Sequence, residues 1–426
     1  MIHPDTLQVH VDVEGESLFA GRVHLHRSRG ELASSTFQYE SSYLAHPRAY
    51  ALDPALDLVS GSQQVFAGLP GAFSDSAPDR WGRRLIAARE RAAALDESRR
   101  PRALDDADFL AGVSDATRQG ALRFRTDDDP VFLGAGHGVP KLLSLPRLLR
   151  ASDAVSQDGD DDDFDAVKAL LSAGTGSLGG ARPKASVVGE DDRQLIAKFP
   201  HHEDQWDVMA WEATALDLAS AAGINAARHT LTRVGGRHVL LLERFDRTHD
   251  ARRIGYISAM TMLERRDGER ADYVDIAEHL PEVSARASDD ARELFRRAAL
   301  SVGLNNTDDH LRNHGFLRHR GGWVLSPAFD INPTPEAKVR QTSVAGSDDV
   351  RTAADGLREL AVACRLSVED ADSELQRIED ALHSWRDVAT GNGVKSAALL
   401  RFVDSFAAGV DAIRRARRAL MGEAHS

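Results

Sequence analysis

The sequence has little cysteine, few aromatic residues and no long apolar run, and these shortages exclude whole classes of protein. Its 426 residues include one cysteine, Cys364, so no disulfide can form within the chain and we expect a reducing compartment. No apolar stretch approaches the roughly 20 residues that cross a bilayer. Residues 1–16 are polar and alternating, unlike a signal peptide. We therefore predict a cytoplasmic protein that does not enter a membrane.

Positive charge is also scarce. The chain has 53 Lys and Arg against 66 Asp and Glu, which gives a net charge of −13. Direct binding to nucleic acid is disfavoured, because phosphate contacts need a local excess of basic side chains. Hydrophobic residues make up 42% of the chain, enough for a sizeable core. The length allows two or three domains, or one two-lobed enzyme with an accessory domain.

The first hundred residues alternate in polarity and then become helical. Residues 7–13 and 18–25 read as two strands joined by a turn at Glu14-Gly15-Glu16. Pro78-Asp79 predicts the start of a helix that runs to about Leu95, since both residue types suit a first helical turn. A β-rich N-terminal part, residues 1–100, is therefore expected.

The pattern changes again beyond residue 174. Strands are predicted at 184–188, 195–199 and 237–245, and a helix at 208–222 that stops at Gly223. The rest of the chain is mainly helical. We predict an α+β, two-lobed fold, with residues 101–246 completing a small β-rich lobe and residues 247–426 forming a mainly helical lobe.

A glycine-rich segment, residues 174–180, matches the pattern GxGxxG. A dinucleotide-binding turn needs a strand before it and a helix after it, and here the predicted order is reversed. A Walker A loop is excluded because no Gly-Lys-Ser/Thr follows. Two interpretations remain open with equal weight: a flap over nucleotide phosphates with Lys184 nearby, or an ordinary linker.

The segment 305–316 is unusually polar and follows an apolar helix. Asp308 and Asn313 stand five residues apart, the spacing of the catalytic Asp and the metal-binding Asn of protein kinases. We predict that Asp308 orients the attacking hydroxyl and that Asn313 binds Mg²⁺. A capping and turn region is the alternative, because Asn and Asp are common there.

A second metal ligand is expected downstream. Residues 316–325 read as a hairpin that turns at Gly321-Gly322 and so returns the chain toward its start. Asp330 would then lie beside Asn313 and share the same ion, since Mg²⁺ prefers carboxylate and other oxygen ligands. His310, in the same loop, is a candidate nucleotide contact, although we favour a structural hydrogen bond for it over proton transfer.

Three further features fit a nucleotide site. Lys198 lies on an apolar strand, where an ATP phosphate would explain a buried lysine, and Glu212 could pair with it. The strand that ends in Glu243-Arg244-Phe245-Asp246 could offer the Glu243 carbonyl and the Phe245 N–H to adenine, with Asp246 near the ribose. Solvated or salt-bridged side chains at a strand end are the alternative.

These segments together resemble the HipA-type toxin kinases of bacterial toxin–antitoxin systems. The resemblance covers nearly the whole chain, and the segments that carry it are FSDSAPDRWGRRL (73–85), SLGGARPK (177–184), IAKFP (196–200), ERFDR (243–247), TDDH (307–310) with Asn313, and PAFDI (327–331). The chain departs from the family in a more glycine-rich loop and in a second carboxylate, Asp309, after Asp308. The Thr-Asp-x-His register favours Asp308 as the base.

The resemblance implies a protein-kinase-like fold with an extra N-terminal subdomain at residues 1–100. It also implies ATP and Mg²⁺ as cofactors, Asp308 as catalytic residue, Asn313 and Asp330 as metal ligands, and Lys198 as a phosphate-binding lysine. Glu243 and Phe245 become adenine contacts. Ser177 takes the place of a serine that the family autophosphorylates, which adds a charge of about −1.5 to −2 and silences the kinase.

The resemblance further implies partners. These are a small helix-turn-helix antitoxin like HipB, a protein substrate such as an aminoacyl-tRNA synthetase, and DNA only indirectly through the antitoxin. The expected function is a serine/threonine protein kinase that acts as the toxin of such a module. Two alternatives stay open: a largely non-catalytic co-repressor that works by binding the antitoxin, and a kinase of small molecules.

Overall fold

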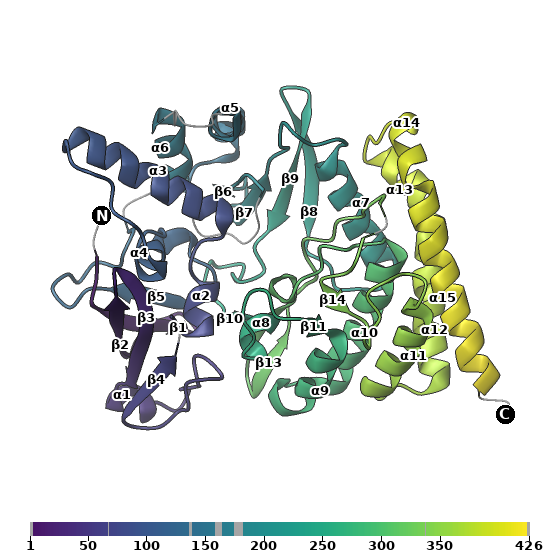
Figure 1. Ribbon diagram of the computed structural model, residues 1–426, viewed down its shortest axis with the longest axis horizontal. Helices are drawn as coiled ribbons and strands as arrows, with labels where there is room; N and C mark the ends of the chain where they lie inside the picture. Colours follow the sequence, from purple (N-terminus) through teal and green to yellow (C-terminus); the bar gives the residue numbers. More distant parts are fainter. Residues whose placement is uncertain are drawn as a thin grey trace. The chain divides into compact units, whose positions relative to one another are not determined.

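The computed structural model describes residues 3–66, 68–135, 139–157, 164–173, 182–336 and 338–423, and these residues form helices and sheets in two compact units (Figure 1). Unit 1 comprises Met1–Glu203 and Thr232–Ile257, and unit 2 comprises Asp204–Leu231 and Ser258–Ser426. The α+β class expected from the sequence is confirmed, because unit 1 contains the large sheets and unit 2 is mainly helical.

Unit 1 opens with a five-stranded sheet in the order β4-β3-β2-β1-β5. Its strands are β1 (Thr6–Val13), β2 (Glu16–Ser28), β3 (Glu31–Tyr39), β4 (Ser62–Phe66) and β5 (Leu122–Arg125). The predicted turn joins β1 to β2, with Val13 opposite Glu16. Glu14 and Gly15 both have positive φ, 52° and 91°, as the tight turns of hairpins require.

Unit 1 also contains helices: α1 (Ser41–Leu44), α2 (Gly71–Asp75), α3 (Arg80–Asp96), α4 (Asp106–Ala111), α5 (Leu145–Gln157) and α6 (Phe164–Ser172). Helix α3 begins where the sequence predicts. Its N-cap is Asp79, whose Oδ1 accepts a hydrogen bond of 2.7 Å from Gly82 N–H. This bond satisfies one of the amide groups that a first helical turn leaves unpaired.

A second sheet of unit 1 has the order β6-β7-β9-β8. Its strands are β6 (Lys184–Val188), β7 (Gln194–Lys198), β8 (His229–Val234, which enters unit 1 at Thr232) and β9 (Arg237–Glu243). One apolar core joins this sheet to helices α3, α5 and α6, and it includes Trp81, Leu148, Leu170, Val187 and Phe199. Helix α3 is thus fixed against β6 and β7.

Unit 2 is built from α7 (Val208–Ala221), α8 (Ala259–Met262), α9 (Tyr273–Val283), α10 (Ala287–Gly303), α11 (Ala353–Ala363), α12 (Val368–His383), α13 (Trp385–Gly391), α14 (Ser396–Leu399) and α15 (Val403–Glu423). Helix α15 packs along α10, α11 and α12. A Cβ on Gly409 would lie 2.2 Å from the carbonyl oxygen of Gly303, so the close approach of α15 to α10 requires glycine at position 409.

The short strands after the second sheet are β10 (Tyr256–Ser258), β11 (Ala271–Asp272), β12 (Gly315–His319), β13 (Gly322–Leu325) and β14 (Thr342–Ser343). The hairpin β12–β13 is confirmed, but its turn is displaced. His319 pairs with Gly322, so the turn residues are Arg320 and Gly321 rather than Gly321 and Gly322. Gly322 lies within β13, where a Cβ would meet Val283 O at 2.6 Å.

The two compact units divide the chain differently from the predicted domains, whose limits stay a prediction. No division between the units falls near residue 100, because α3 packs on the second sheet. Asp204–Leu231 belongs to unit 2, although the strands before and after this segment, β7 and β9, belong to unit 1. Helix α7 explains this second difference, since its apolar face packs on α12 and α13. Within the ranges that the structure describes, no helix is both long and apolar enough to cross a membrane.

Candidate active site

The polar loop after α10 is held in place by the carbonyl groups of a later segment. Asn305 has a positive φ of 53°, which turns the chain out of the helix. Its Nδ2 donates hydrogen bonds of 2.8 Å to Thr334 O and of 2.8 Å to Glu336 O. The loop that begins at Asn306 therefore has a defined starting point.

The two adjacent carboxylates of this loop have opposite environments. Asp309 is buried, and its Oδ2 accepts hydrogen bonds from the Tyr273 hydroxyl and, at 2.8 Å, from the Ser301 hydroxyl. Its Oδ1 lies 3.0 Å from His314 Nε2. Asp308 is exposed, and its Oδ1 accepts a 2.7 Å hydrogen bond from Gln341 Nε2. A substrate can reach Asp308, whereas Asp309 is fully engaged inside unit 2.

The pKa of Asp309 reflects those contacts. Burial alone would raise it, but the neighbouring His314 and the hydrogen bonds from Tyr273 and Ser301 outweigh burial and lower the pKa to about 2. Burial and the Asp309 charge together raise the pKa of the Tyr273 phenol well above its ordinary value. Asp309 is therefore an ionised anchor for the loop.

Asn313 is joined to Asp308 directly. It lies in a 3-10 turn, Leu311–Asn313, and its Nδ2 donates a 3.0 Å hydrogen bond to the backbone oxygen of Asp308. With the amide nitrogen used in this way, Oδ1 is the atom that remains to bind a cation. Amide and carboxylate oxygens suit Mg²⁺, so the donor set of Asn313 and Asp330 fits that ion.

The hairpin returns the chain to this loop as expected. Beyond the paired residues of β12 and β13, Ser326 N–H donates a 2.8 Å hydrogen bond to Gly315 O. Asp330 follows four residues later with a positive φ of 56°, a conformation that Asp adopts more readily than most residues. Its Oδ1 accepts a 3.3 Å hydrogen bond from Asn332.

We expected a structural hydrogen bond from the His310 side chain, and its Nδ1 does not make one within the described ranges. That nitrogen is buried. The ring sits at the N-terminal end of the turn that carries Asn313. A nucleotide contact of His310 stays a prediction.

Two lysines of the second sheet lie opposite each other in unit 1. Lys184 on β6 pairs in register with Lys198 on β7, and both side chains are buried, at 2% and 7% relative exposure. Residues opposite one another on antiparallel strands point to the same face. Lys184 Nζ lies 2.8 Å from Oδ2 of Asp79, the N-cap of α3. The structure thus adds Asp79 to the two predicted lysines.

The residues predicted to contact adenine and ribose follow the end of β9. Glu243 is the last residue of that strand, and its side chain bonds to Arg193 at 2.8 Å. Phe245 is half-buried, and its ring lies 6.3 Å from that of Tyr256. These contacts are compatible with a backbone role of Glu243 and Phe245, which stays a prediction.

Asp246 has a different environment from the one predicted. It is buried at 3% exposure and accepts hydrogen bonds from Arg244, Arg247 and Gly120 N–H. Burial by itself would raise its pKa, but the two guanidinium groups outweigh burial and hold it below its usual range. Both carboxylate oxygens serve this internal cluster, which argues against a ribose contact and for a structural role.

The predicted residues therefore fall into two groups. Lys184, Lys198 and Glu243-Phe245-Asp246 belong to unit 1, while Asp308, His310, Asn313 and Asp330 belong to unit 2. Ser177 and the whole glycine-rich segment, residues 174–180, lie outside the described residues.

No pattern in the sequence pointed to the residues that hold the loop of unit 2. Arg340 is buried, and its Nη1 donates hydrogen bonds of 3.1 Å to the Ser301 hydroxyl and of 3.0 Å to Asn306 O. Gln341 binds Asp308, and Tyr273 binds Asp309. A single Arg or Tyr has no distinguishing spacing in a sequence, so only the folded chain reveals these roles.

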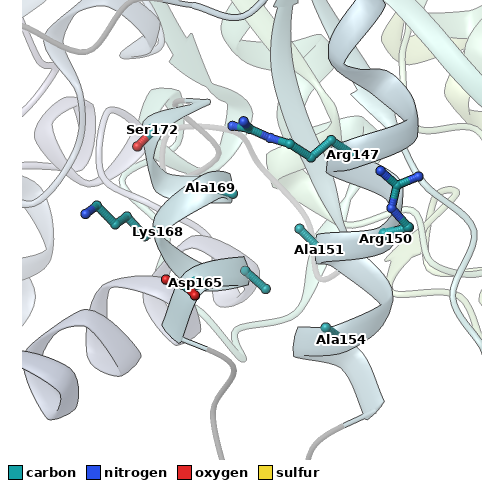
Figure 2. Close-up of a pocket in the computed structure, with 9 residues that line it drawn as sticks. Arg147, Arg150, Ala151, Ala154, Asp165, Lys168, Ala169 and Ser172 are labelled. Atoms are coloured by element: carbon teal, nitrogen blue, oxygen red, sulfur yellow. The ribbon is translucent and has the colours of Figure 1, made fainter.

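A pocket of about 490 Å³ lies between α5 and α6 in unit 1 (Figure 2). Its lining includes Arg147 and Arg150 from α5, and Lys168, Asp165 and Ser172 from α6. Three basic side chains and one acidic side chain give it a positive balance. None of the predicted site residues lines this pocket, so it is separate from the candidate site.

Two family models match the chain. The HipA N-terminal domain matches residues 12–124, and the HipA-like C-terminal domain matches residues 176–385. The second range contains every candidate site residue named above except Asp79, which lies in the first.

Individual relatives are more distant. The protein named "Putative kinase Y4mE" of Sinorhizobium fredii is 27% identical over 151 residues, which span 33% of this chain and only 34% of that protein. The structure of HipA from Shewanella oneidensis MR-1, solved with HipB and operator DNA, has a TM-score of 0.69 at 13% identity. That match covers 96% of this chain and 97% of the other, and it shows a common fold.

Proposed function

Because this chain belongs to the HipA family, we propose that it is an ATP- and Mg²⁺-dependent serine/threonine protein kinase. The observation that carries the proposal is the loop of unit 2. It presents an exposed Asp308, bonds Asn313 to the backbone of that residue, and buries the adjacent Asp309 as an anchor. A non-catalytic binding module has no need of this arrangement.

In the proposed reaction, a substrate hydroxyl attacks the γ-phosphorus of ATP. Asp308 accepts a hydrogen bond from the hydroxyl and orients it, and takes up its proton as the new O–P bond forms. The bond from the γ-phosphorus to the leaving oxygen breaks, which releases ADP. Mg²⁺, when bound, neutralises charge on the phosphates. Asn313 and Asp330 would hold it through their side-chain oxygens, and Lys198 would bind a phosphate.

The direct test is incubation of the purified protein with labelled ATP and Mg²⁺, using a protein mixture and a metabolite mixture as separate acceptors. We expect label on protein, on a serine or threonine, and none with Asp308→Asn. Label on a metabolite alone would instead establish a small-molecule kinase. Absence of label in every arm, with ATP binding intact, would favour the co-repressor alternative.

Two finer proposals concern regulation and partners. Autophosphorylation at Ser177 is checked by mass spectrometry of protein that has been incubated with ATP, with Asp308→Asn as control. A HipB-like antitoxin is proposed because the Shewanella relative was solved with HipB and operator DNA. A neighbouring frame that encodes a small helix-turn-helix protein, and binding of its product to this chain, would support a toxin role. An aminoacyl-tRNA synthetase is the first substrate to test.

A further inference from the structure

The N-terminal part of unit 1 contributes a charged residue to the lysine pair of the second sheet. Asp79 caps α3, and its two oxygens have separate roles: Oδ1 accepts from Gly82 N–H at 2.7 Å, and Oδ2 lies 2.8 Å from Lys184 Nζ. The Asp79 and Lys184 side chains are 8% and 2% exposed. This contact is therefore a buried ion pair, held at a fixed helix end.

The ion pair between Asp79 and Lys184 lies beside Lys198. The two lysines are directly opposed across β6 and β7, and such residues have Cβ atoms roughly 5 Å apart. Like charges that face each other in this way repel, and burial strengthens the repulsion. Asp79 offsets one of these two positive charges.

The packing keeps Asp79 in this position. The apolar core that joins α3 to the second sheet includes Trp81 and Leu85 from the helix and Ala185 and Ala197 from the strands. Trp81 follows the cap by two residues, and the two alanines flank the lysines in sequence. The start of α3 and the two strands that carry the lysines are consequently joined by one apolar core.

We propose that Asp79 is a charge-balancing residue for nucleotide binding. It sets the net positive charge that Lys184 and Lys198 present to the phosphates of ATP. The inference rests on the proposed function, because it takes Lys198 as the phosphate-binding lysine. It adds that the N-terminal HipA domain, through Asp79, tunes the affinity of the C-terminal HipA-like domain for ATP.

The sign of the effect follows from the charges. Asp79→Asn keeps an oxygen for the helix cap but makes the net charge beside the lysines more positive by one unit, so ATP should bind more tightly. Lys184→Gln makes that net charge less positive by one unit, so ATP should bind more weakly. One unit charge several ångström from a phosphate, in a medium of effective dielectric near 20, shifts the affinity for ATP on the order of tenfold or more. A purely structural role predicts weaker binding in both variants.

The experiment compares ATP and adenosine binding by calorimetry for the full chain and four variants. Asp79→Asn and Lys184→Gln should shift ATP affinity in opposite directions, with Asp79→Asn/Lys184→Gln between them. Adenosine has no phosphate, and its affinity should change less than twofold. Asp96→Asn is the matched control, because Asp96 is exposed on the same helix about 25 Å away.

The outcomes separate this inference from the proposed function. If the parent chain binds no ATP, the kinase proposal fails. If it binds ATP but both single variants weaken binding, or adenosine shifts as much as ATP, Asp79 has only a structural role and the inference is wrong. Should Asp79→Asn fail to fold, Lys184→Gln and the double variant still decide, since the double variant must bind ATP more tightly than Lys184→Gln alone.

Discussion

The adjacent carboxylates Asp308 and Asp309 should respond to the same substitution in opposite ways. Asp309→Asn removes the charge that faces His314 in a buried site, while Tyr273 and Ser301 keep donating to that position. Asp309 also interacts electrostatically with the buried guanidinium of Arg340, and removing one partner of such a buried charge pair costs about 3–5 kcal/mol. That is a large part of the roughly 5–15 kcal/mol by which a domain is stable.

Asp308→Asn should leave the fold almost unchanged. The residue is exposed, and its side chain bonds to Gln341, so the free energy of unfolding should change by about 0.5 kcal/mol or less. Phosphate transfer should nevertheless fall by about 10²- to 10⁴-fold, the usual contribution of a positioned acid or base. ATP affinity should stay close to that of the parent.

The assays are urea unfolding and transfer of label from ATP. Tryptophan fluorescence reports on unit 2, because Trp211 stacks on Phe402 at 3.8 Å and Trp385 stacks on Phe406 at 4.4 Å. We expect Asp309→Asn to lower the unfolding midpoint and Asp308→Asn to leave it in place. A stable, inactive Asp309→Asn beside an active Asp308→Asn would refute the assignment and make Asp309 the base.

Three further predictions concern other parts of the chain. Burial and two neighbouring arginines lower the pKa of His10 from 6.5 to about 4. Between these two pH values His10 is protonated in the unfolded chain and neutral in the folded chain. The contribution of His10 to the free energy of unfolding is therefore fully present above pH 6.5 and falls by up to about 3 kcal/mol as the pH drops to 4. The free energy of unfolding of His10→Gln should lack this pH dependence, whereas that of His24→Gln, a substitution at an exposed histidine, should keep it. Gly409→Ala should destabilise unit 2 by about 1–3 kcal/mol or more, because its Cβ would meet Gly303 O, and an unchanged melting temperature would contradict the close approach. Removal of Mg²⁺ by EDTA should abolish phosphate transfer. Asn313→Ala should raise the Mg²⁺ concentration needed for the half-maximal rate of phosphate transfer, and it should leave the affinity for adenosine unchanged.

Local patterns identified much of the fold. The first hairpin, the start of α3 and the two strands that carry Lys184 and Lys198 were all predictable, because turn residues, caps and alternating polarity depend on near neighbours in the chain. The turn of the β12–β13 hairpin was predicted at Gly321-Gly322, one residue too late, since two successive glycines give no local preference between the two registers. The division into two compact units is not visible in the sequence, because it depends on which elements pack together.

For the candidate site, the sequence by itself determined which residue types are present and at what spacing, which was enough to single out Asp308, Asn313 and Asp330. Only the tertiary structure decided that Asp309 is buried while Asp308 is exposed, because burial depends on contacts with Tyr273 and other residues remote in sequence. The same holds for Asp79, which lies 105 positions from Lys184 in the chain and 2.8 Å from it in the fold. The spacing of residues along a chain reflects the structure within one helix, strand or loop, whereas burial and charge pairing depend on contacts between different elements.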